Sequence, residues 1–157
     1  MSKITPFFWY ALEAEEAANH YVSIFPNSKI VTVTYYGENM PLPKGTVMTV
    51  AFELDGQPYV ALNGGPAQSF NHSVSFVVNC ETQAEIDSYW EKLSAGGKEV
   101  ACGWLTDKYG LSWQITPSNI AKLLDAKTPA KSQAVMQVMM TMVKLDIAAL
   151  EKAYASG

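Results

Sequence analysis

The stretch Thr46-Val-Met-Thr-Val-Ala-Phe-Glu-Leu-Asp-Gly-Gln-Pro-Tyr-Val-Ala-Leu-Asn63 decides the fold class. Two runs rich in β-branched, aliphatic and aromatic residues, 46–54 and 58–63, predict strands. They flank Asp55-Gly56, a dipeptide that strongly favours a tight hairpin turn. The stretch therefore predicts two antiparallel neighbours in a sheet.

The residues before this hairpin supply the rest of a supersecondary unit. Residues 4–10 and 29–36 have strand-like composition, and residues 17–25 place apolar side chains at helical spacing. The order is strand, helix, strand, strand, strand. A sheet with a helix on one face is expected from this order.

The same order returns after Gly64-Gly65-Pro66. Residues 73–79 predict a strand, and Thr82-Gln-Ala-Glu85 has the capping-box form that opens a helix. Three short strand candidates follow, at 99–103, 104–107 and 111–116. The sequence predicts an α+β domain over residues 1–117, with βαβββ modules at about 1–66 and 67–117. Residues 118–157 predict a helical extension of the same domain.

Composition excludes several classes of protein. The chain has 157 residues, 48% of them apolar, and a net charge of −4 without a basic stripe. Nucleic-acid binding is therefore not expected. We expect no membrane association and a cytoplasmic location, because no apolar run reaches the length of a membrane span and the first residues lack a signal-peptide pattern. Cys80 and Cys102 show no CxxC spacing, so we expect reduced thiols.

Alternation along the strands predicts which side chains face the helices. Trp113 and Ile115 should face a helix, opposite Ser112, Gln114 and Thr116. In the hairpin, Val60 and Leu62 should face a helix, opposite Tyr59, Ala61 and Asn63. The second sheet face could line a wet pocket, or it could simply meet solvent.

Several short motifs accompany the duplicated unit. These are Ala17-Ala-Asn-His-Tyr21 before Phe25-Pro-Asn-Ser28, Leu62-Asn-Gly-Gly-Pro66, Cys102-Gly-Trp-Leu105, Tyr109-Gly-Leu-Ser-Trp-Gln114 and Lys144-Leu-Asp-Ile147. With these motifs the chain resembles the PhnB-like branch of the vicinal oxygen chelate superfamily. The resemblance implies paired modules that curl into a cupped mixed sheet, a pocket inside the cup and a homodimer. Whether the modules swap between subunits stays open.

The resemblance also implies metal-ligand positions on the first and last strands of each module. In this chain they fall at or near Pro6, at Ala61 or Asn63, at Ser73 or His72, and at Gln114. Apart from His72, none of these side chains is a carboxylate or an imidazole, so we expect no metal and no other cofactor. His72 is left open as a ligand, and for His20 we expect packing or a surface hydrogen bond.

The function expected from these observations is metal-free binding of an unknown small molecule. Phe8 and Trp104 would stack on the ligand, and Asn63, Ser75 and Gln114 would bind it through hydrogen bonds. One alternative is a metal-dependent lyase, isomerase or dioxygenase of the same fold. Another is the 3-demethylubiquinone-9 3-methyltransferase whose label PhnB-like sequences carry, although the glycine-rich turn of the usual α/β methyltransferases is missing. No catalytic residue is assigned.

Overall fold

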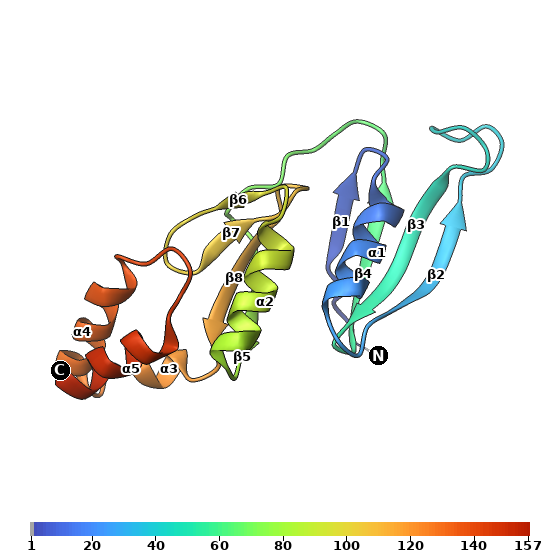
Figure 1. The fold of residues 1–157 in the computed structure, drawn as a ribbon. Coiled ribbons are helices and arrows are strands. Elements are labelled where there is room, and N and C mark those ends of the chain that lie inside the picture. The colour runs from blue at the N-terminus through green and yellow to red at the C-terminus, as the bar shows by residue number, and fades with distance from the viewer. Residues whose placement is uncertain (1) are drawn as a thin grey trace. The chain divides into compact units, whose positions relative to one another are not determined.

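The order of helices and strands in the computed structural model, which describes residues 2–157, follows the predicted order (Figure 1). The elements are β1 (Phe7–Tyr10), α1 (Ala14–Ile24), β2 (Lys29–Tyr35), β3 (Val47–Leu54), β4 (Gln57–Asn63), β5 (Ser75–Cys80), α2 (Gln83–Ser94), β6 (Lys98–Glu99), β7 (Trp104–Thr106), β8 (Ser112–Pro117), α3 (Ile120–Leu123), α4 (Pro129–Met139) and α5 (Ile147–Ser156). None of the helices among the described residues is long and apolar enough to cross a membrane.

Two structural units divide the chain, the first ending at Ser69 and the second running from Phe70 to Gly157. Each unit contains one four-stranded mixed sheet, ordered β1-β4-β3-β2 in the first and β5-β8-β7-β6 in the second. In both sheets the first and last strands of the unit are parallel neighbours and the other pairs are antiparallel. The α+β fold with a duplicated βαβββ unit is therefore confirmed.

Local chemistry explains where two of these elements turn or begin. Asp55 and Gly56 both have positive φ angles, 48° and 77°, which is the backbone geometry of a two-residue type I′ hairpin. The side chain of Thr82 accepts a hydrogen bond of 3.2 Å from the backbone N–H of Glu85 at the start of α2. Both features were predicted from the sequence.

The core of the first unit lies between α1 and its sheet (Figure 1). Phe8, Tyr21, Phe52 and Tyr59 are buried there. The prediction for β4 is wrong, because Tyr59, Ala61 and Asn63 are the buried residues and their neighbours Val60 and Leu62 are partly exposed. Apolar side chains occupy both faces of this strand, so hydrophobicity alone does not show which face the helix covers.

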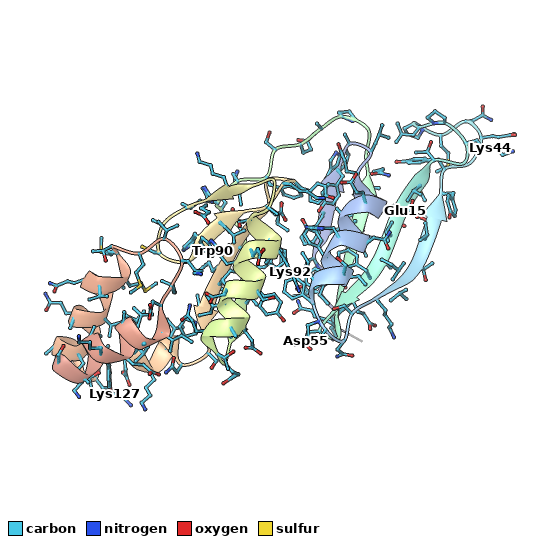
Figure 2. The ribbon with its side chains drawn as sticks, viewed as in Figure 1. Glu15, Lys44, Asp55, Trp90, Lys92 and Lys127 are labelled. Carbon is cyan, nitrogen blue, oxygen red and sulfur yellow. The ribbon has the colours of Figure 1, made fainter. Side chains whose placement is uncertain are left out.

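The core of the second unit lies between α2 and its sheet. Trp113 and Ile115 are buried as predicted. Trp90 of α2 (Figure 2) donates a hydrogen bond of 2.7 Å from its Nε1 to Glu99 Oε1 on β6. This side-chain bond links α2 to the outermost strand of the sheet.

The helical extension has a small core of its own, made of Leu123, Val135, Leu145, Leu150 and Ala153. It belongs to the second unit, and Figure 1 shows its three helices grouped together. Asp146 caps α5, because its Oδ1 accepts a hydrogen bond of 2.9 Å from Ala149 N–H.

Gln83, in the first turn of α2, fastens this extension to the module. Its Nε2 donates to the carbonyl oxygen of Leu145 over 3.0 Å, and its Oε1 accepts from the N–H of Ile147 over 2.9 Å. One side chain therefore satisfies two backbone groups next to the N-terminus of α5.

Candidate functional site

The side of the second sheet that faces away from α2 gathers three of the residues proposed from the sequence. Gln114 lies in the middle of β8, with Val77 of β5 as its register partner on one side and Trp104 of β7 on the other. Gln114 Nε2 donates a hydrogen bond of 2.9 Å to Ser75 Oγ. Because paired residues point to the same side of a sheet, these side chains form one surface.

His72 adds an imidazole to this surface. Its Nδ1 lies 2.9 Å from the hydroxyl oxygen of Ser112, and its ring centroid is 6.0 Å from that of Trp104, with the ring planes at 80°. Ser112 is fully buried, whereas His72 is exposed. We call the surface formed by His72, Ser75, Val77, Trp104, Ser112 and Gln114 the polar face.

Phe8 lies elsewhere. It belongs to the first unit and is only 5% exposed, in contact with the rings of Phe52 and Tyr59 at centroid distances of 6.4 and 5.7 Å. Burial also raises the pKa of the Tyr59 hydroxyl. The observed role of Phe8 is therefore in the core under α1, and its stacking on a ligand stays an untested prediction.

The side chain of Asn63, at the end of β4, bonds to the backbone of α1 and of β3. Its Oδ1 accepts from Ala14 N–H over 2.8 Å, and its Nδ2 donates to the Val47 carbonyl over 3.0 Å. Its own carbonyl accepts a hydrogen bond of 2.6 Å from the Tyr36 hydroxyl. These contacts explain why a polar side chain is 2% exposed, and they leave its predicted ligand contact untested.

The corresponding side of the first sheet has a different character. Phe7 and Trp9 of β1 are register partners of Val60 and Leu62 of β4, and all four lie opposite the face that α1 covers. Trp9 Nε1 donates a hydrogen bond of 2.7 Å to the Pro66 carbonyl. A Cβ at Gly64 would overlap the Trp9 ring, so only glycine fits there.

Phe7, Trp9 and Ser112 were not among the site residues proposed from the sequence. The alternation Phe7-Phe8-Trp9-Tyr10 gives no contrast between faces, since all four residues are aromatic. Alternation does place Ser112 on the same strand face as Gln114, but it gives no sign of the contact between the Ser112 hydroxyl and His72.

A divalent ion, as implied by the resemblance, needs a set of carboxylate or imidazole ligands. On the sides that face away from α1 and α2, strands β1, β4, β5 and β8 carry Phe7, Trp9, Pro58, Val60, Leu62, Ser75, Val77, Ser112 and Gln114, together with Asn79 and Thr116. Within residues 2–157 no group of three or more His, Cys, Asp or Glu residues could hold a metal ion. The donor chemistry of these faces therefore does not fit a divalent ion.

The charge on the polar face is low. All 11 basic residues of the chain are lysines, and none is arginine. Lys98 lies on the outermost strand, β6, where it is the register partner of Thr106 on β7. Thr106 pairs in turn with Ser112 on β8. This lysine therefore lies two strands away from β8. Among the residues that the structure describes, the centre of the polar face carries no carboxylate and no ammonium group.

Comparisons with known proteins assign this architecture to a family. Residues 2–116 match the family model described as 3-demethylubiquinone-9 3-methyltransferase. The extension from residue 118 onward lies outside this match. No curated protein matches the chain.

Three solved structures illustrate the similarity. The PhnB protein from Bacillus cereus is 38% identical, with a TM-score of 0.67, over 74% of this chain and 99% of that one. A protein from Pseudomonas aeruginosa is 17% identical, with a TM-score of 0.61, over 74% of this chain and 98% of that one. The fosfomycin resistance protein FosX from Listeria monocytogenes, solved with Mn(II) and sulfate, is 14% identical, with a TM-score of 0.52, over 81% of this chain and 98% of that one.

The last two likenesses concern the fold alone, whereas the family match and the Bacillus cereus relative concern the sequence as well. On these grounds the chain belongs to the PhnB-like 3-demethylubiquinone-9 3-methyltransferase family, within the vicinal oxygen chelate superfamily.

Proposed function

We propose that the protein binds a small organic molecule on the polar face and that it does so without a resident divalent ion. The observation that carries this proposal is the Gln114–Ser75 hydrogen bond next to Trp104, on a sheet face that α2 does not cover. A flat apolar ring beside a few fixed polar groups is typical of small-molecule sites.

Burial supports the same assignment. Trp113 and Ile115 are buried on the α2 side, whereas Val77 is 49% exposed and Gln114 and Trp104 are partly exposed. Around Gln114 the polar face is therefore accessible within this unit, whereas Ser112 at the same face is buried.

A pair of variants in adjacent residues tests the proposal. Gln114→Leu should weaken binding several-fold with little change in melting temperature, because a lost hydrogen bond costs on the order of 1 kcal/mol. Ile115→Ala should instead lower stability by about 2–5 kcal/mol, because it leaves a cavity under α2. The reverse pattern would contradict the assignment of faces.

Ligands can be found by fluorine NMR. The chain has four tryptophans, so protein grown with 5-fluorotryptophan should give four signals. The signal that disappears in Trp104→Phe belongs to Trp104. A compound that shifts this signal first, and the others later or not at all, binds at the polar face.

The metal-free state is tested by elemental analysis of protein purified without a histidine tag. We expect far less than one equivalent of zinc, manganese, nickel or iron. A stoichiometric metal that is lost in His72→Ala would favour the metal-dependent enzyme of the same fold. The methyltransferase alternative predicts calorimetric binding of a methyl donor, which the polar face gives no reason to expect.

We also propose that the protein is a homodimer and works in the cytoplasm. Phe7, Trp9 and Tyr35 are 58%, 37% and 58% exposed on the first sheet, and a second copy would cover such apolar surface. The two free thiols suit a reducing compartment. Light scattering should give about twice 17.2 kDa, and a monomer mass at micromolar concentration would refute the dimer.

A further inference from the structure

We propose that the ligand of the polar face is a neutral aromatic molecule with an amide-like edge, such as a carboxamide or a lactam. This inference rests on the proposed function and specifies the chemical class that the site accepts. Three properties of the polar face carry it: its charge, its hydrogen-bonding pair and its aromatic surface.

The first property is the lack of a counter-charge. An anionic ligand that leaves water needs a cation or several charge-assisted hydrogen bonds in return. The side chains around Gln114 are Ser75, Val77 and Trp104, and none of them is basic. The imidazole of the polar face, that of His72, lies against the Trp104 ring and the Ser112 hydroxyl. Lys98 is the basic residue in register with this face, and it lies on the outer strand β6. A cationic ligand likewise finds no carboxylate among these described side chains.

The second property is the pair formed by Gln114 and Ser75. A glutamine amide has a donating and an accepting end, and the serine hydroxyl both donates and accepts. Gln114 makes one side-chain hydrogen bond within residues 2–157, the one to Ser75. Ser75 can bond to either the nitrogen or the oxygen of the Gln114 amide, and in both cases the other amide atom makes no side-chain hydrogen bond within residues 2–157. Together the two side chains can offer a donor and an acceptor side by side, which is the complement of an amide edge.

The third property is the Trp104 ring, directly opposite Gln114 in the ladder. His72 meets this ring at 80°. Its bond to Ser112 Oγ holds the imidazole in place. Indole and imidazole, with the exposed Val77 beyond Gln114, form an apolar and aromatic margin around the amide pair. A planar ligand ring that stacks on Trp104 would bring its amide substituent toward Gln114.

The experiment compares naphthalene-2-carboxamide with naphthalene-2-carboxylate, two probes that share the ring and differ in charge. Binding is followed at neutral pH by the fluorine signal of 5-fluoro-Trp104 and by calorimetry. We expect the carboxamide to bind at least about tenfold more tightly. In Gln114→Leu the carboxamide should lose about five- to tenfold in affinity, which corresponds to the loss of one hydrogen bond. The affinity of the carboxylate should barely change in this variant.

Lys98→Gln serves as the matched control. Loss of the Lys98 ammonium group should leave carboxamide binding unchanged, because the proposed contacts lie on β5, β7 and β8. If the carboxylate binds as well as the carboxamide, or binds more tightly and loses this advantage in Lys98→Gln, the neutral class is wrong while binding at the polar face stands. If neither probe shifts the Trp104 signal at millimolar concentration, the proposed function fails together with the inference.

Discussion

Asn63 Oδ1 accepts a hydrogen bond of 2.8 Å from the backbone N–H of Ala14, so the last residue of β4 caps the first turn of α1 across 49 positions of sequence. A helix leaves its first N–H groups without partners inside the helix, and a side-chain oxygen is the usual remedy. Glu13, the residue that precedes α1, makes no such side-chain bond to the helix. In this module the N-terminus of α1 is therefore capped by a residue at the end of β4, whereas most helices are capped by the residue that precedes them.

Replacement of Asn63 should therefore affect folding more than binding. Asn63→Ala removes the cap and leaves the Val47 carbonyl without its donor, so we expect a loss of about 2–4 kcal/mol in urea unfolding. Asn63→Asp keeps the accepting oxygen for Ala14 N–H, but it places a carboxylate oxygen against the Val47 carbonyl at a position that is 2% exposed, so it should lose at least as much as the alanine variant. An alanine variant that unfolds like the wild-type protein and loses only ligand affinity would return Asn63 to the binding site.

Asp107 anchors the turn before β8. Its Oδ1 accepts from the N–H groups of Tyr109 and Leu111 over 2.9 and 3.0 Å, and its Oδ2 accepts from Trp113 Nε1 over 2.9 Å. Asp107→Asn can keep the two backbone bonds, but its NH2 group would then face the indole N–H. We expect a loss of about 1–3 kcal/mol in stability.

The contribution of the indole contact can be isolated by a double-mutant cycle with Trp113→Phe. When Trp113→Phe is already present, the Asp107→Asn change should cost clearly less, because the donor that clashes with the amide is gone. Equal costs with and without the indole would show that the backbone bonds alone account for the role of Asp107.

Most of the fold was predictable from the sequence because its signals are local. Asp55-Gly56 specifies its turn by backbone preference, and Thr82 with Glu85 specifies a helix start by a contact three residues apart. The faces of β4 were not predictable in this way. Val60 and Leu62 are as apolar as Tyr59 and Ala61, and the decision comes from long-range contacts: α1 sits on the Tyr59 side, and Asn63 is needed there as a cap.

The candidate site was predictable in part for the same reason. Gln114 stands out as a polar residue between Trp113 and Ile115, so alternation alone puts it opposite the helix. The approach of His72 to Ser112 spans 40 positions and has no local signature. Phe8 and Phe7 are identical in type, and only the position of α1 separates the buried ring from the exposed one.

Thr116 is a further polar residue of β8, and its hydroxyl is buried without a hydrogen-bond partner among residues 2–157. An unsatisfied buried hydroxyl costs about 1–3 kcal/mol. Thr116→Val has nearly the same shape and lacks the hydroxyl, so its unfolding free energy should equal or exceed that of the wild-type protein by up to about 1 kcal/mol.

Thr34→Val is the matched control, because the Thr34 hydroxyl is hydrogen-bonded to that of Thr49. This variant should lose about 1 kcal/mol. A comparable loss in Thr116→Val would mean that a bound water or another group satisfies the Thr116 hydroxyl.

The two side-chain hydrogen bonds of Gln83 should determine how stably the helical extension is attached to α2. Gln83→Leu removes both hydrogen bonds to residues 145 and 147, and we expect faster proteolysis and faster amide exchange between residues 118 and 150. The ion pair of Lys144 with Asp87, at 2.7 Å, also joins α2 to the segment before α5, but its two side chains are 41% and 49% exposed. Lys144→Ala should therefore have a much smaller effect. Equal protease sensitivity of the two variants would contradict the role given to Gln83.

Cys80 gives the fold a dependence on alkaline pH. Burial raises the pKa of its thiol from 9.0 to about 11, and the carboxylates of Glu85 and Glu81 add to the shift. The folded state thus holds the thiol proton more tightly than the unfolded state. The resulting stabilisation is complete below about pH 9 and is lost as the pH rises through 9 toward 11.

Urea unfolding at several pH values measures this effect. The free energy of unfolding should fall between about pH 9 and pH 11 more steeply in the wild-type protein than in Cys80→Ala, which lacks the buried thiol.

Alkylation at about pH 8 gives an independent test, because Cys80 is 1% exposed and Cys102 is more accessible. Iodoacetamide should modify Cys102 first and Cys80 only after unfolding. Equal alkylation rates in the native protein would show that the Cys80 side of the sheet opens readily, and the predicted pH dependence would then be absent as well.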